Sequence, residues 1–222
     1  MTAKEKYNEE KDELRLARMN RILSCAFELF SVNGIDNVAM TDIAKKAEIG
    51  VASLYRYYET KDEIAIRTII WAWENQRESI IPPMLKETFK NASGLEQLRQ
   101  ELGVFSSLLE NQPAFLRYIY FFDSYAVRTQ IAPQRLADYE KEIQNVQNVV
   151  VTSIKKGIED GSVKAIYKEK EVQLYFALTH ALFNSAQKLS LSGKMLNMDS
   201  SNNGKIELDN LVSILIEGIK NQ

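Results

Sequence analysis

Apolar residues recur with the period of an α-helix along almost the whole chain, and this pattern most constrains the fold. From Met19 onward they fall three or four residues apart, which places them on one face of a helix. No stretch alternates apolar and polar residues between turn signals, as a half-buried strand does. Four prolines and nine glycines in 222 residues are too few for a turn-rich sandwich or barrel. The pattern therefore predicts an all-α fold.

Glycine and proline divide the pattern into about nine helices. The first apolar face ends before Asn33-Gly34, because glycine tolerates the left-handed conformation that closes a helix. A capping box from Thr60 to Glu63 predicts the start of a long helix, which we expect to stop at Pro82-Pro83. Two short helices are expected at about 42–47, with Thr41 as N-cap, and at 51–57. Longer helices are expected at about 95–110, 114–129, 133–159, 168–191 and 207–220, with a polar connection over 192–205.

The chain contains one cysteine and one histidine, which limits the chemistry it can perform. A disulfide within the chain is impossible, and a zinc site of cysteines and histidines lacks ligands. A hydrolytic triad would have to use His180. The sequence has no phosphate loop, no Gly-x-Gly-x-x-Gly and no His-Glu-x-x-His. We therefore expect no enzyme activity, no metal and no cofactor.

Charge and hydropathy give an expectation for the compartment. The first thirteen residues are highly charged, so we expect no signal peptide. The longest apolar stretch without charge, 172–187, is shorter than the roughly 20 residues of a membrane-spanning helix. The formal net charge of −2 rules out a sequence-blind polycation but not a local DNA-reading surface. We expect a cytoplasmic protein with no membrane partner, and the free Cys25 fits a reducing compartment.

The segment from Thr41 to Lys61 has the ingredients of a helix-turn-helix. In this motif one short helix crosses the DNA backbone and the second lies in the major groove. Small and apolar side chains let the two helices cross closely, and Gly50 lies between them. The residues expected in this contact are Ile43, Ala44, Ala47 and Leu54.

At these residues the chain resembles the DNA-binding domain of the TetR family of bacterial transcriptional regulators. The resemblance covers about residues 18–70, and the rest of the chain resembles the family only in its helix rhythm. The matching residues are Ala26, Leu29, Phe30, Gly34, Thr41, Ile43, Ala44, Ala47, Leu54, Tyr55, Tyr57, Tyr58 and the run from Lys61 to Ile64. The resemblance implies a helix-turn-helix domain over 15–62, with the motif at about 41–57, and a ligand-binding and dimerisation domain over 63–222.

The turn of the motif departs from the family pattern. Where the family usually has Ala-Gly-Val-Ser, this chain has Ala47-Glu48-Ile49-Gly50. Gly50 replaces a hydroxyl N-cap, which costs only a few tenths of a kcal/mol. Ala52 stands where the family often has glycine. These changes affect base preference more than they affect the fold.

The resemblance also implies which residues face DNA. Those expected to contact phosphate or line the groove are Thr41, Ser53, Tyr55, Tyr57 and Lys61. Those expected at base edges are Val51, Ala52 and Arg56, because arginine pairs with guanine and small apolar groups contact thymine methyls.

Each of these assignments has a plainer alternative. Arg56 is alternatively a solvated surface charge, and one of the tyrosines at the end of the second helix, Tyr58, is expected in the core. The stripe of Arg15, Arg18 and Arg21 lies along phosphate or is simply a solvated helix face.

Aromatic residues crowd the C-terminal part of the chain and suggest a small-molecule pocket. The candidate effector residues are Phe105, Tyr118, Phe121, Phe122, Tyr125, Tyr139, Phe176 and His180. An apolar pocket with a few polar groups is the usual form of such a site. Plain core packing is the alternative for the rings, and a buried, hydrogen-bonded histidine is the alternative for His180.

The last two long helices, 168–191 and 207–220, are apolar on nearly all sides. A helix of this kind must be buried all round, which terminal helices achieve most easily in a subunit interface. The family resemblance implies an intersubunit four-helix bundle from these two helices. We therefore expect a homodimer.

The function expected from the sequence is a sequence-specific repressor. It would bind a palindromic operator in double-stranded DNA and leave it when a small apolar or aromatic effector binds. One alternative is an architectural or cell-division DNA-binding protein on the same fold, without an effector. A helical carrier or metabolic enzyme with an accidental resemblance is the third hypothesis, and the matching residues argue against it.

Overall fold

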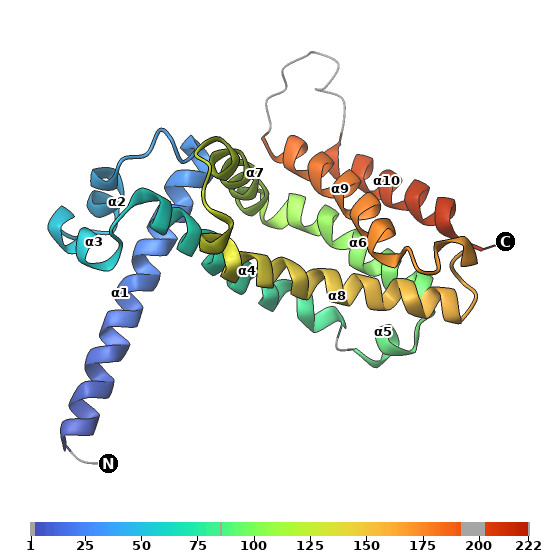
Figure 1. Ribbon diagram of the computed structural model, residues 1–222, viewed down its shortest axis with the longest axis horizontal. Helices are drawn as coiled ribbons and strands as arrows, with labels where there is room; N and C mark the ends of the chain where they lie inside the picture. The colour runs from blue at the N-terminus through green and yellow to red at the C-terminus, as the bar shows by residue number, and fades with distance from the viewer. Residues whose placement is uncertain (1–2, 85, 192–202, 222) are drawn as a thin grey trace. The chain divides into compact units, whose positions relative to one another are not determined.

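The computed structural model describes the backbone of residues 3–84, 86–191 and 203–221, and the side chains of 5–76, 86–191 and 203–221 (Figure 1). Every regular element in these ranges is helical, so the predicted all-α class is confirmed. The α-helices are α1 (Ala3–Asn33), α2 (Met40–Lys46), α3 (Val51–Tyr57), α4 (Lys61–Met84), α5 (Glu87–Asn91), α6 (Gly94–Asn111), α7 (Pro113–Arg128), α8 (Ala137–Glu159), α9 (Glu171–Ser190) and α10 (Gly204–Ile219). Two short 3-10 helices, η1 (Pro133–Leu136) and η2 (Ala165–Tyr167), precede α8 and α9.

Several predicted helix boundaries are wrong, each for a local reason. The fourth helix, expected to end at about residue 80 before Pro82-Pro83, continues to Met84, because the fixed φ of proline is compatible with a helical backbone. The helix expected from residue 168 begins at 171, because Glu169 has a left-handed φ of 65°. The helix expected from 133 starts as the 3-10 turn η1, and α5 was not predicted.

The helix caps were also predicted only in part. α2 begins one residue before Thr41, because the Asp42 carboxylate accepts a hydrogen bond from the Ala39 N–H at 2.8 Å and makes Ala39 the N-cap. At the start of α4 the Thr60 hydroxyl accepts from the Glu63 N–H at 3.1 Å, as expected. The Glu63 carboxylate, however, accepts from the Glu59 N–H at 2.8 Å rather than from that of Thr60.

The polar connection predicted over 192–205 lies mostly outside the described residues. Its last residues are described, and they cap α10. The Asn203 side chain accepts hydrogen bonds from the N–H groups of Lys205 at 3.0 Å and Ile206 at 3.4 Å.

The chain divides into two compact units that exchange segments. The first unit comprises Met1–Glu74 with Tyr118–Tyr139, and the second comprises Asn75–Arg117 with Glu140–Gln222. The unit that contains the helix-turn-helix therefore also contains most of α7. A segment from the C-terminal half of the sequence, residues 118–139, is thus part of the helix-turn-helix unit, and we call it the return segment.

The core of the first unit forms where α1 packs on α2, α3, α4 and α7. Gly34 closes α1 with a φ of 74°, as the Asn33-Gly34 signal predicted. The four side chains expected at the helix-turn-helix crossing have no exposed surface, and Tyr58 is 2% exposed, which confirms these core predictions. Aromatic rings fill the space beside them. Phe30, Tyr118 and Phe122 have no exposed surface, and the half-buried Phe27 packs edge-on against Tyr118 at 5.6 Å.

The second unit is a helical bundle in which α6, α8, α9 and α10 contribute the buried leucine, isoleucine and valine residues. The start of α6 and the end of α8 touch through glycine, since a Cβ on Gly94 would lie 2.0 Å from the Gly157 nitrogen. α9 and α10 are not buried all round within one chain, and the expectation that a subunit interface covers them stays a prediction. Their exposed apolar residues are Val172, Phe176, Ile206 and Ile214. In the part of the chain that the structure describes, no helix is long and apolar enough to cross a membrane.

Candidate nucleic-acid interface and the segment that holds it

The turn between α2 and α3 fixes the angle at which the two helices cross. Glu48 has a left-handed φ of 54°, and the Ile49 N–H donates to the Ala44 carbonyl at 3.0 Å. Gly50 is the N-cap of α3 and has no side-chain cap hydrogen bond. The next turn closes when the Ser53 N–H donates to the Gly50 carbonyl at 2.8 Å. The result is two short helices in a fixed crossing, as a helix-turn-helix requires.

The face of α3 opposite the core is exposed. Leu54 is fully buried, whereas Val51 is 38% exposed and Tyr55 is 48% exposed. Of the other residues expected to face DNA, Thr41, Ala52 and Arg56 are exposed, and Ser53 and Tyr57 are half-buried. The Arg56 guanidinium donates to the Ser53 hydroxyl at 2.7 Å, so this arginine lies back along its own helix.

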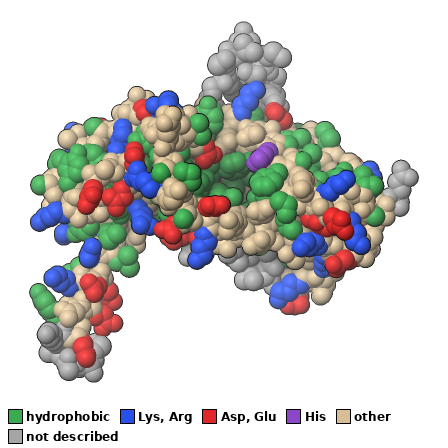
Figure 2. All heavy atoms as spheres, viewed as in Figure 1, with side chains coloured by type: hydrophobic (Ala, Val, Ile, Leu, Met, Phe, Trp, Pro, Cys, Tyr) green, Lys and Arg blue, Asp and Glu red, His purple; other side chains and the backbone are tan. Residues whose placement is uncertain are grey.

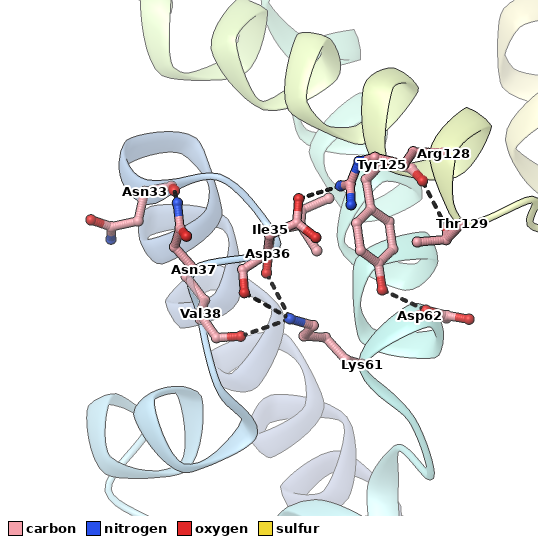
Figure 3. A network of polar contacts seen from close by, with 10 residues as sticks. All are labelled: Asn33, Ile35, Asp36, Asn37, Val38, Lys61, Asp62, Tyr125, Arg128 and Thr129. Atoms are coloured by element: carbon pink, nitrogen blue, oxygen red, sulfur yellow. Dashed lines mark hydrogen bonds and ion pairs between the residues drawn. The ribbon is translucent and has the colours of Figure 1, made fainter.

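Lys61 has a different environment from the one expected of a phosphate contact. Its ammonium donates to the backbone carbonyls of Ile35 at 3.0 Å, Asp36 at 3.2 Å and Val38 at 3.2 Å (Figure 3). An ammonium has three N–H donors, and all three have partners here. Lys61 therefore fixes the connection between α1 and α2 to the start of α4, and this geometry gives no support to a phosphate contact.

Asp62 joins the return segment to the same turn of α4. Its carboxylate accepts hydrogen bonds from the Tyr125 hydroxyl at 2.6 Å and from the Arg135 guanidinium at 3.0 Å. The hydrogen bond from Tyr125, together with Arg135, lowers the pKa of Asp62 below its usual 3.8, despite partial burial that acts in the opposite direction. Figure 3 shows this contact beside an ion pair between Arg128 and Asp36.

These polar contacts tie the C-terminal end of α7 and η1 to the helix-turn-helix unit. Arg128 also lies over the Tyr125 ring, 5.8 Å from its centroid, and Arg67 on α4 pairs with Asp138 on α8 at 3.1 Å. We call the contacts of Asp62 with Tyr125 and Arg135, and of Asp36 with Arg128, the α7 clamp. Sequence reasoning missed this clamp, because its bonded partners lie 63 to 92 residues apart and no local pattern links them.

Five of the eight candidate effector residues belong to this same unit, and the most buried of them are core. Tyr118 and Phe122 have no exposed surface. The Tyr118 ring stacks on Phe30 at 5.9 Å, and its hydroxyl donates to the Ala65 carbonyl at 2.7 Å. Phe122 packs on Tyr139 at 5.3 Å. The plain-core alternative therefore fits these rings, and the Tyr125 hydroxyl is occupied by Asp62.

Phe121, Phe105, Phe176 and His180 complete the candidate set. Phe121 contacts Gly34 in the first unit, and Phe105 packs on Phe183 at 5.7 Å in the second. His180 is exposed, so the alternative of a buried histidine is wrong. Its ring lies 5.3 Å from that of Phe176, which is 42% exposed.

A polar pocket of about 280 Å³ adjoins the α7 clamp in the first unit. It is lined by Glu63, Ile66, Arg67, Gln134, Arg135, Ala137 and Asp138. Among the described side chains, no group of three or more histidine, cysteine, aspartate or glutamate residues is arranged to hold a metal ion.

The sequence and fold are similar to those of known regulators. Residues 22–68 match the family model described as bacterial regulatory proteins, tetR family. A structure of a tetR-family regulatory protein from Rhodococcus RHA1 superposes with a TM-score of 0.67 at 14% identity, over 92% of this chain and 98% of that one. The fatty acid degradation regulator FadR from Bacillus halodurans gives 0.68 at 13% identity, over 92% and 97% of the two chains.

A third structure, FadR from Bacillus subtilis in complex with stearoyl-CoA, gives a TM-score of 0.61 at 16% identity, over 90% of this chain and 98% of that one. No curated protein sequence matches the chain. The helix-turn-helix and the family match identify residues 22–68 as a DNA-binding domain of the TetR type, and the chain as a whole shares the fold of TetR-family transcriptional regulators.

Proposed function

We propose that this regulator is a homodimeric repressor that a small apolar or aromatic effector releases from a two-fold symmetric operator. The observation that carries the DNA-binding part is the exposed face of α3. An apolar side chain and a tyrosine, Val51 and Tyr55, project from a short helix that is anchored on its other side by the fully buried Leu54. A single chain gains nothing from exposing them, whereas the major groove offers thymine methyls and phosphates.

Within this interface the residues have different tasks. One set of side chains contacts phosphate or lines the groove and sets the register of the protein on the duplex. This set is Thr41, Ser53, Tyr55 and Tyr57. Val51, Ala52 and Arg56 approach the base edges. Arg56 must leave the Ser53 hydroxyl to reach guanine, and this exchange of one hydrogen bond for a bidentate contact favours a specific site over a random one.

Dimerisation follows from the exposed apolar residues of α9 and α10. Ile214 is 68% exposed and Phe176 is 42% exposed, on helices whose other faces form the core of the second unit. Burying these side chains against a second copy gains about 25 cal/mol per Å² of apolar area. A two-fold dimer presents two α3 helices, so its half-sites lie about 34–36 Å apart, or a multiple of this distance.

The release step uses the α7 clamp. An effector shifts an equilibrium only through its different affinity for two states. We propose that the second state differs in the position of the segment 118–139. This segment contacts the first turn of α4 through Asp62 and the α1–α2 connection through Asp36. An apolar effector is supported by one fold neighbour, which was solved with stearoyl-CoA.

The DNA interface is tested by measuring equilibrium binding to an operator duplex and to single-base variants of it. Tyr55→Ala should weaken binding to every duplex alike. Arg56→Ala should lose about 1–3 kcal/mol at one base position and little elsewhere. Arg99→Ala removes the same charge from α6 in the second unit and should change neither result. A uniform loss for Arg56→Ala over all variants would instead assign Arg56 to phosphate.

A further inference from the structure

We propose that the N-terminal part of α1, residues 5–18, is a second DNA-binding element that lies along the sugar-phosphate backbone beside the site read by α3. We call this segment the N-terminal arm. The inference rests on the proposed function, because it requires duplex DNA on α3. It adds a surface outside residues 22–68, the part that matches the family model.

The arm extends α1 well beyond what the core requires. No residue from 5 to 18 is buried, and the first buried residue of the helix is Ile22. Fourteen helical residues span about 21 Å at 1.5 Å per residue. A helix with no buried face gains no stability from packing, so an isolated extension of this length is marginal by itself.

The charges of the arm are separated onto different faces. Lys11, Arg15 and Arg18 follow one another at intervals of four and three residues, which places them above one another on one face. A second face has Glu5, Glu9 and Glu13, at intervals of four residues. Figure 2 shows the acidic side chains of this helix gathered along one of its sides.

The basic face of the arm opens toward the end of α3. Lys11, Arg15 and Arg18 line one groove together with Tyr57, the last residue of α3. The groove has a volume of about 540 Å³, and Asn8, Asp12 and Leu14 complete its lining. A phosphate backbone that passes Tyr57 therefore meets three cations on the adjoining helix face.

The three cations have no partner within the described part of the chain. Each is exposed, and none makes a hydrogen bond or an ion pair there. Like charges four residues apart, such as Lys11 and Arg15, destabilise an isolated helix. A row of phosphates removes this repulsion, because each phosphate is a strong acceptor with the opposite charge.

The net charge of the arm does not prevent this contact. Residues 5–18 contain four basic and five acidic side chains, a net charge of 4 − 5 = −1. The acidic side chains Glu5, Glu9 and Glu13 face away, across a helix about 10–12 Å in diameter. Charges separated by more than about 8 Å are largely screened at physiological salt. Asp12 also lines the groove, so DNA there meets three cations and one carboxylate, a net charge of 3 − 1 = +2.

The test measures the salt dependence of binding of the full chain to a random-sequence duplex. Each lost phosphate contact should reduce the slope of log K against log salt by about 0.9. Arg15→Gln should therefore reduce the slope by about 0.9 for each arm bound, and the triple variant Lys11→Gln, Arg15→Gln, Arg18→Gln by up to three times as much. Lys6→Gln is the matched control. It removes one charge from the same arm, but Lys6 lies three and four residues before Glu9 and Glu10, on the acidic face.

The outcomes separate this inference from the proposed function. A lower slope for Arg15→Gln with an unchanged slope for Lys6→Gln supports the arm. If Arg15→Gln leaves the slope at the wild-type value, or changes it as much as Lys6→Gln does, the arm does not bind phosphate. The proposed function is unaffected by that result as long as the wild type binds DNA. An absence of wild-type binding contradicts the proposed function itself. If the triple variant instead changes the oligomeric state in sedimentation, the basic face is a contact between copies of the chain and the inference is wrong.

Discussion

At the scale of single residues, Glu48 occupies the position in the α2–α3 turn with a left-handed backbone. Its φ of 54° suits glycine, and a residue with a Cβ in this region costs about 1–2 kcal/mol. In the sequence, Glu48 stands where the usual Ala-Gly-Val-Ser turn of the family has glycine. Only the structure shows that the departing residue is the one with the unusual φ, and that its carboxylate pairs with Arg21.

Glu48→Gly should raise the free energy of unfolding by about 0.5–1 kcal/mol, since the relieved strain exceeds the extra entropy of glycine in the unfolded chain. Denaturant unfolding measures this change. Glu48→Gln keeps the left-handed residue and removes only an exposed ion pair, so it should change stability by less than about 0.5 kcal/mol. Equal stability of the two variants would show that the turn is not strained.

Lys61 and Asp62 mark the limit of sequence reasoning at this scale. The pattern correctly predicted that these residues begin a helix. It did not predict the partners of their side chains, since the carbonyls held by Lys61 lie 23 to 26 residues away and Tyr125 lies 63 residues from Asp62. Buried apolar residues such as Leu54 were predictable because periodicity places them, whereas polar contacts depend on the tertiary fold.

At the scale of helices, α6 and α8 are joined by a buried carboxyl group. Glu101 on α6 is 5% exposed and accepts a hydrogen bond from the Ser153 hydroxyl at 2.7 Å. Burial raises the pKa of Glu101 from 4.5 to about 8. Between these two values the unfolded chain is ionised at Glu101 while the folded chain retains the proton. The free energy of unfolding therefore falls as the pH rises through this range.

Glu101→Gln removes this titration while keeping the shape of the side chain. Relative to the variant, the wild type should lose up to about 1.4 kcal/mol of unfolding free energy per pH unit between pH 4.5 and 8. Urea unfolding at several pH values provides the comparison. Glu110→Gln, an exposed carboxylate on the same helix, should leave the pH dependence unchanged. Parallel curves for the wild type and Glu101→Gln would contradict the shifted pKa.

Tyr125→Phe tests the α7 clamp by removing the donor to Asp62. We expect a loss of about 1 kcal/mol in unfolding free energy at neutral pH, together with altered DNA affinity, although Tyr125 lies outside the proposed interface. The lowered pKa of Asp62 makes this contribution complete above pH 3.8, and it is lost as the pH falls through the lowered pKa. Tyr120→Phe, an exposed ring on the same helix, is the control. The same DNA affinity in both variants would separate the clamp from DNA binding.

The helices themselves were largely predictable, whereas their ends were not. Each long apolar face predicted one helix, and α3 appears at the predicted residues 51–57. The predicted start of α9 was wrong because Glu169 has a left-handed backbone conformation, which is unusual for a glutamate and could not be predicted from the residue type. Helix ends depend on single hydrogen bonds, such as the one between Ala39 and Asp42, and periodicity contains no information about them.

At the scale of the whole molecule, the exposed apolar residues of α9 and α10 predict a dimer. Phe176→Glu combined with Ile214→Glu should give a monomer in sedimentation at concentrations where the wild type is a dimer, because it places charges in an apolar contact. Val127→Glu changes an apolar residue on α7 that is 80% exposed and should leave the dimer intact. A monomeric wild type, or dissociation in all variants alike, would contradict this interface.

The measurement that tests the central claim most directly is selection of duplexes from a random-sequence library by the full-length protein. A two-fold dimer with one α3 helix per subunit should enrich an inverted repeat. The half-site centres should lie about 34–36 Å apart, or a multiple of this distance. Enrichment of a site without two-fold symmetry would contradict the dimeric arrangement, and no enrichment over the starting library would contradict sequence-specific DNA binding itself.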